Sequence, residues 1–193
     1  MAVTAVTIAS RAMNMIGGNE ISSFSETSNE AKVANNLYVP LIEAALTLHR
    51  WRFATGQSLM SRLVAAPAAR WDAAYQIPTS PKVLMIHGIT IIDMPIQYDR
   101  YEDMIYCNAG ADDLVYIDFA YYPPEAYWPP YFVKAVQLEL AAVFAGSLAR
   151  KGDLALFYEK KAIEAYKQAR WADSSSQTAR NVRTSRLINA RRG

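Results

Sequence analysis

The segment from residue 131 to 149 limits the possible folds of this chain more than any other, because as a helix it is apolar around nearly its whole circumference. One row at i, i+4 spacing holds its larger apolar side chains, Phe132, Val136, Leu140, Phe144 and Leu148. Small residues occupy much of the remaining surface, so another backbone can approach closely. Pro129 and Pro130 mark its start, since proline fits the first turn of a helix. Other elements must cover such a helix, and we expect it to be the core helix of a bundle.

Two helices are expected before this central helix. The first runs from residue 4 to about residue 16, where a pair of glycines ends it. The second runs from residue 29 to about 53, because Thr27 and Glu30 have the spacing of a capping box. Pro40 lies inside this second segment and removes one helical hydrogen bond, so the sequence predicts a kink or a break there.

A fourth helix is expected from residue 154 to about 172. We predict that Gly152 ends the central helix and that Asp153 caps the next one. Because the link is short, the two helices should form an antiparallel hairpin. Glu164 and Lys167 have the spacing of an ion pair on its exposed face.

Between the second and the central helix, the helical period fades and short β-favouring runs appear. These runs are 58–63, 71–77, 82–86, 89–92 and 114–121. We interpret His87 and Gly88 as a turn between two of them. A strap rich in proline and aromatic residues follows, and we expect Tyr122, Tyr127 and Trp128 to pin it against the bundle.

The sequence therefore predicts an α+β fold: an antiparallel bundle of about four helices with an inserted small, mostly antiparallel β-module and an extended C-terminal arm. The expected divisions are 1–55 for the N-terminal helices, 56–128 for the β-module and strap, 129–173 for the C-terminal helical hairpin and 174–193 for the arm.

Charge is distributed unevenly along the chain. The formal net charge is only +2, but the last 20 residues contain five of the 20 basic residues and none of the 18 acidic ones. This tail therefore carries +5 and the rest of the chain −3. Its arginines surround one apolar pair, Leu187 and Ile188, and such a segment cannot bury a core alone. We expect an arm that becomes ordered on a partner.

Three interpretations of the arm remain open. Arginine is the preferred cation of protein interfaces and the apolar pair can act as an anchor, which favours docking on a protein. The same arginines could neutralise phosphates and give a salt-dependent affinity for nucleic acid. The segment could also be a plain tail. We prefer protein docking, because nucleic-acid arms usually carry lysines and lack an apolar pair.

Residues able to carry chemistry are few. His49 and His87 lack metal-ligand spacing, and we interpret them as packing and turn residues. Cys107 has no nucleophile signature and is interpreted as a small hydrophobic residue. The acidic groups Asp112-Asp113 and Asp99 with Glu102-Asp103 could hold a metal or serve an undetected hydrolase or lyase, but solvated loops are the simpler interpretation. We expect no enzyme activity and no cofactor.

The sequence has one cysteine, no apolar run of membrane-spanning length and no signal-peptide pattern at its N-terminus. We therefore expect no internal disulfide, no membrane partner and synthesis inside the cell.

The order of several features resembles one protein family. The features are the pair Gly17-Gly18, the loop from Ile21 to Ser28, the helical run from Ala31 to Leu41, the stretch Leu48-His49-Arg50-Trp51-Arg52-Phe53-Ala54, the run Ala74-Tyr75-Gln76-Ile77-Pro78, the strand ending at Ala120-Tyr121 and the helix from Phe132 to Ala142. Over residues 4 to 175 this order is similar to that of the tail tubular protein A-like head-to-tail adaptors, or connectors, of short-tailed phages. The arm is the part least matched.

The resemblance implies a structural virion protein, made in the host cytoplasm, at the head-tail interface. It implies a homo-oligomeric ring, typically of twelve subunits, between the portal protein and the tail nozzle protein, with genomic DNA passing through the lumen. In some members a C-terminal extension reaches the portal. By analogy, the expected portal-binding residues are Arg180, Arg183, Arg186, Leu187, Ile188, Arg191 and Arg192.

Overall fold

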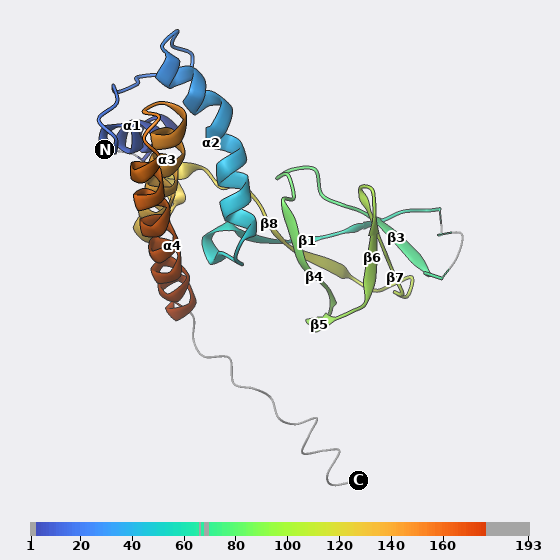
Figure 1. Cartoon of the computed structure of the whole chain (residues 1–193). Helices are drawn as coiled ribbons and strands as arrows, with labels where there is room; N and C mark the ends of the chain where they lie inside the picture. Colours follow the sequence, from blue (N-terminus) through green and yellow to red (C-terminus); the bar gives the residue numbers. More distant parts are fainter. Residues whose placement is uncertain (1–2, 66, 68–69, 177–193) are drawn as a thin grey trace.

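The computed structural model describes residues 3–65, 67 and 70–176 of the chain. The described helices are α1 (Ala5–Met15), α2 (Asn29–Thr47), α3 (Pro130–Ser147) and α4 (Gly152–Ser175), with short 3-10 helices η1 (Arg52–Ala54) and η2 (Glu125–Tyr127). The strands are β1 (Thr55–Leu59), β2 (Ser61–Arg62), β3 (Ala73–Gln76), β4 (Met85–Ile91), β5 (Met94–Pro95), β6 (Tyr98–Tyr101), β7 (Met104–Cys107) and β8 (Val115–Ala120). The helices gather on one side and the strands on the other (Figure 1), so the α+β prediction is confirmed for the described residues.

Helix α3 is the central helix of the bundle, as predicted, and it contacts α1, α2 and α4. Phe132, Val136, Leu140 and Phe144 are fully buried along one row. Leu148, the last member of the predicted row, is the C-cap and is only partly buried. The apolar circumference of α3 is therefore satisfied by three other helices.

The predicted ends of α1 are confirmed, whereas the predicted cap of α2 is not. Thr4 caps α1 by accepting a hydrogen bond from the backbone N–H of Thr7 at 3.2 Å. The first glycine after α1, Gly17, has a positive φ of 74°, as a left-handed helix end requires. The capping box predicted for α2 is wrong by one residue, because Ser28, not Thr27, accepts the N–H of Ala31.

Helix α2 differs from the prediction at its end. It passes through Pro40 without a break and ends at Thr47 rather than near residue 53. The chain turns there because Trp51 is buried among the bundle aromatics, with ring centroids 5.0 Å from Phe132. Its indole N–H also donates to the carbonyl of Ala45 at 2.9 Å, which folds the chain back onto the helix end.

The predicted link between α3 and α4 is also corrected. Helix α4 begins at Gly152, so this glycine opens α4 instead of ending α3. Lys151 occupies the N-cap position without a side-chain cap, and Asp153 lies in the first turn, where its charge suits the helix dipole. Glu164 and Lys167 approach within 3.9 Å, as predicted. At the other end α4 continues to Ser175, so it includes residues 174 and 175, the first two of the expected arm.

The β-module consists of two antiparallel four-stranded sheets, in the orders β1-β8-β4-β5 and β2-β3-β7-β6. The segment 55–62 contributes β1 to the first sheet and β2 to the second, and the segment 94–101 contributes β5 to the first and β6 to the second. These two segments therefore connect the sheets at both edges. The enclosed apolar side chains form a second core separate from that of the bundle. Its larger members are Met60, Tyr75, Ile89, Ile105, Ile117 and Phe119.

Two strand predictions fail in the module. His87 and Gly88 are not a turn but lie inside β4, where the register with β8 shifts between Ile86 and Gly88. The hairpin of β6 and β7 was not predicted, because its residues lack the regular alternation that marks a half-buried strand.

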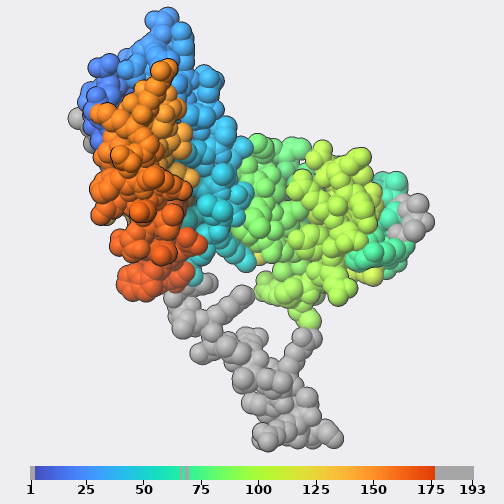
Figure 2. All heavy atoms as spheres, in the orientation of Figure 1, coloured from blue at the N-terminus to red at the C-terminus, as the bar shows by residue number. Residues whose placement is uncertain are grey.

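The β-module meets the bundle at the end of α2, and the two bodies lie side by side (Figure 2). Polar contacts cross this junction: Lys82 reaches Glu43 of α2 at 2.8 Å, and Arg50 reaches Asp118 of β8 at 3.1 Å. In the returning strap Trp128 is buried and Tyr122 packs against the bundle core, but Tyr127 is exposed and does not pin the strap. No helix of the described residues is long and apolar enough to span a membrane.

Candidate docking site at the end of helix α4

The predicted portal-binding residues Arg180, Arg183, Arg186, Leu187, Ile188, Arg191 and Arg192 lie outside the described residues. What the structure does define is the point of departure of the arm. Ser176 closes helix α4, and the last turns of this helix pack against the segment that follows α2. The candidate docking site is therefore built from the end of α4 and the surfaces beside it.

Asp173 fixes the end of α4 to the bundle. Its side chain is only 1% exposed, because it continues the buried face of α4 formed by Ala162, Ala165, Tyr166 and Ala169. One carboxylate oxygen accepts the hydroxyl of Tyr131 at 2.8 Å, and both oxygens lie 3.3 Å from the backbone nitrogen of Arg52. The carboxylate also faces the Arg52 guanidinium at 3.9 Å and the Nε2 atom of His49 at 3.7 Å.

These contacts explain why a carboxylate is tolerated there. A negative charge near a helix C-terminus is repelled by the helix dipole, and burial adds a further penalty. The hydrogen bonds that Tyr131 and Arg52 donate to the carboxylate offset both the dipole repulsion and the cost of burial. Burial lowers the pKa of His49, while the nearby Asp173 acts in the opposite direction. Burial and the bond to Asp173 raise the pKa of Tyr131 well above its usual value, so its hydroxyl remains a donor.

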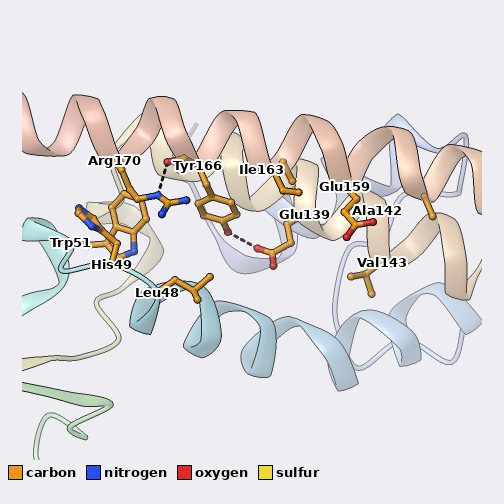
Figure 3. A pocket seen from close by; sticks show the side chains of 12 residues that line it. Leu48, His49, Trp51, Glu139, Ala142, Val143, Glu159, Ile163, Tyr166 and Arg170 are labelled. Carbon is orange, nitrogen blue, oxygen red and sulfur yellow. Dashed lines mark hydrogen bonds between the residues drawn. The ribbon is translucent and has the colours of Figure 1, made fainter.

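A groove of about 430 Å³ opens beside α4, between α4, the end of α2 and α3 (Figure 3). Its apolar lining includes Leu48, Ala142, Val143 and Ile163. Leu48 is 70% exposed and Ile163 is 50% exposed, so these apolar side chains are not covered by the chain's described residues. We call this surface the acidic groove, because its lining holds two carboxylates, Glu139 and Glu159, against one guanidinium, Arg170.

Glu139 is the only charged residue of α3 besides Lys134, and it points into this groove toward Tyr166 (Figure 3). The Tyr166 hydroxyl donates to its Oε2 atom at 2.5 Å. Burial raises the pKa of Glu139, and the hydrogen bond from Tyr166 only partly offsets this rise. Burial also raises the pKa of Tyr166 far above its usual value, and the Glu139 carboxylate adds to the rise. The pair thus holds one partly desolvated carboxylate at the groove floor.

The other side of α4 has a second groove of about 540 Å³, lined by Tyr131, Ala165 and Trp171. Trp171 is 76% exposed. Two lysines, Lys134 and Lys167, line this second groove, so we call it the basic groove. Helix α4 therefore separates two apolar grooves of opposite charge.

The remaining candidates from the sequence are not brought together. Cys107 is fully buried in β7, where burial raises the pKa of its thiol to about 11, as expected for a small hydrophobic residue. Asp113 accepts the N–H of Gly110 at 2.7 Å within its own loop, and Asp99 pairs with Arg70 at 3.2 Å. Within the residues the structure describes, no group of three or more His, Cys, Asp or Glu side chains could hold a metal ion.

Sequence reasoning did not single out Asp173, Glu139 or Tyr166. A signal existed for Glu139, since a carboxylate in a helix that is apolar nearly all round must either reach solvent or find a donor. Asp173 gave no such signal, because its donors come from 42 and 121 residues away in the chain.

No protein-family model matches this chain, and its sequence matches no curated protein. The assignment to a class therefore depends on the sequence resemblance and on the surfaces described above, and it is made as a proposal.

Proposed function

We propose that the protein is a structural head-to-tail adaptor of a tailed phage. It assembles as a homo-oligomeric ring, expected to have twelve subunits, between the portal protein and the tail nozzle protein. Genomic DNA passes through the lumen of this ring. The C-terminal arm docks on the portal.

One observation carries the ring proposal: helix α4 presents uncovered apolar surface on two different sides. A closed ring uses heterologous contacts, in which one face of a subunit meets a different face of its neighbour. Leu156, Phe157, Ile163 and Trp171 are all large apolar side chains that remain exposed on α4. A helix that had only to complete its own bundle would not need them, since Ala162, Ala165 and Ala169 form most of its buried face.

The β-module supports contact with a second ring. Its β4–β5 turn exposes Ile92 and Met94, and the neighbouring start of β8 exposes Leu114. Ile92 has a φ of 50°, a conformation that is strained for a β-branched residue. Strained positions of this kind persist only where the surrounding structure holds them, and they cluster at functional sites. We assign this apolar tip to the contact with the nozzle.

The arm supports contact with the portal. Asp173 holds the last turn of α4 in place, so the arm leaves from a fixed point on the bundle. The arm then offers five arginines and one apolar pair to a partner. This mixture fits a protein surface with an apolar pocket and acidic rim.

Electron microscopy of the purified protein mixed with its portal tests the proposal. The wild-type chain should form rings on portal. A variant with Leu187→Ser and Ile188→Ser should leave the body folded and abolish rings on portal, whereas the control Ser175→Ala should not. Normal assembly of the double variant would contradict the role of the arm, and absence of rings from the wild-type mixture would contradict the adaptor proposal.

A further inference from the structure

The acidic groove combines two chemical features that select a particular kind of occupant. Its exposed apolar side chains, Leu48 and Ile163, and the half-buried Val143 favour an aliphatic side chain. The carboxylates of Glu139 and Glu159 lie among them and favour a neighbouring cation. An occupant with aliphatic residues flanked by arginines would satisfy both features.

The chain itself contains such a segment beyond the described residues. Leu187 and Ile188 are its apolar pair, with arginines at 183, 186, 191 and 192 and no acidic residue between 174 and 193. Its positive charge is opposite to the net charge of the acidic groove, where two carboxylates face the single guanidinium of Arg170. The basic groove, lined by Lys134 and Lys167, would repel the same segment, so charge complementarity selects one side of α4.

The distance between the end of α4 and the acidic groove can be spanned by the chain. Ser176 lies 13 residues beyond Ile163, which corresponds to about 20 Å along a helix at 1.5 Å per residue. Leu187 lies 11 residues beyond Ser176, and an extended chain of this length reaches about 36 Å. The segment can therefore reverse direction after α4 and still place its apolar pair beside Ile163.

We propose that in the free chain the segment from Arg183 to Arg192 docks in the acidic groove of its own chain, with Leu187 and Ile188 against the apolar lining and the arginines beside Glu139 and Glu159. A tethered segment has an effective concentration in the millimolar range, far above that of a second copy in a dilute solution. The chain's own segment therefore occupies the groove before a segment from another copy does.

This inference goes beyond the proposed function and does not depend on it.

Disulfide trapping in the full-length chain, without portal, tests the docking. The variant with Ile163→Cys and Leu187→Cys is oxidised at low micromolar concentration, and the bridge is mapped by mass spectrometry. The native Cys107 is fully buried in the β-module and should not react. The matched control is Trp171→Cys with Leu187→Cys, because residue 171 is exposed and lies closer to Ser176 along α4.

Docking predicts that the 163–187 bridge forms within one chain at least about tenfold faster than the 171–187 bridge, as expected for an increased effective concentration at the groove. Random motion of a tether predicts the reverse order, because residue 171 is nearer. Adding Glu139→Gln and Glu159→Gln to the first pair should slow its bridge severalfold. If Ile163→Cys does not fold by circular dichroism, Leu48→Cys replaces it, since Leu48 lines the same groove and is more exposed.

Equal rates for the two pairs, a faster control or a bridge mainly between two chains would each overturn the proposal. A rate unaffected by the two glutamine substitutions would also overturn the assigned charge contact. None of these results bears on whether the protein forms rings on portal, so failure of this inference is distinguishable from failure of the proposed function.

Discussion

Replacement of Asp173 by alanine should strongly destabilise the chain and release the end of α4. The substitution removes both acceptor oxygens from the Tyr131 hydroxyl and from the backbone N–H of Arg52. Loss of the partner of a buried donor costs about 1–3 kcal/mol for each donor. Relief of the unfavourable helix-dipole interaction returns about 0.3–1 kcal/mol. The expected loss of unfolding free energy is therefore about 1–6 kcal/mol.

Two further variants separate the parts of this loss. Asp173→Asn keeps one acceptor oxygen and nearly the same shape, so it should cost less than the alanine variant. Tyr131→Phe removes one donor and should cost about 1 kcal/mol. In the Asp173→Ala background the same change should cost almost nothing, because the hydroxyl has already lost its acceptor.

Urea denaturation followed by circular dichroism measures these differences. With an m-value of about 2–3 kcal/mol per molar urea, the alanine variant should lower the midpoint by about 0.3–3 M without changing m. Ser175→Ala is the control from the same turn, and its midpoint should stay near that of the wild type. A loss below about 1 kcal/mol for Asp173→Ala, or full additivity with Tyr131→Phe, would refute the argument that buried donors depend on this carboxylate.

Three other predictions concern the core, the acidic groove and the arm. Trp51→Ala should cost about 3–5 kcal/mol in urea denaturation, because it empties a fully buried site, and Trp51→Phe should cost less while leaving the Ala45 carbonyl without its donor. Burial raises the pKa of Glu139 above its unfolded value, so the stability it contributes is present below the unfolded pKa near 4.5 and is lost as the pH rises through the folded pKa. The unfolding free energy of Glu139→Gln relative to that of the wild type should therefore rise between pH 4 and pH 7 in the same assay. A difference that does not change with pH would contradict the burial of Glu139. Finally, if the arm binds nucleic acid instead of protein, affinity for duplex DNA should fall steeply with salt, and a chain ending at residue 176 should lose that slope; the adaptor proposal predicts a weak slope for both.

The sequence predicted best those features that depend on near neighbours in the chain. The prediction of helix α3 was correct because a helix that is apolar around its circumference must be buried, whichever elements pack against it. Its partner α1 was placed to within a few residues by apolar periodicity and its glycine pair, and α4 by apolar periodicity alone, since the interpretation of Gly152 was wrong. The features that failed required knowledge of distant partners. The end of α2 at Thr47, for example, depends on the burial of Trp51 against Phe132 on α3.

The β-module shows the same limit. Local composition separated it correctly from the helices, but the turn expected at His87 lies within β4, whose pairing with β8 continues across a register shift. Strand pairing is decided by the partner strand, and β8 begins 24 residues after β4 ends. The closing of the two sheets through 55–62 and 94–101 is likewise a property of pairing and not of either segment alone.

The sequence by itself determined that a covered helix organises the chain, that a β-module interrupts the helices and that positive charge collects at the C-terminus, because periodicity and composition are properties of adjacent residues. Only the tertiary structure decided where the functional surfaces lie. Asp173 finds its donors across 42 and 121 residues, and Glu139 meets Tyr166 across 27. Buried polar groups are satisfied by whichever donors packing brings within hydrogen-bond distance, and packing is settled by the whole chain.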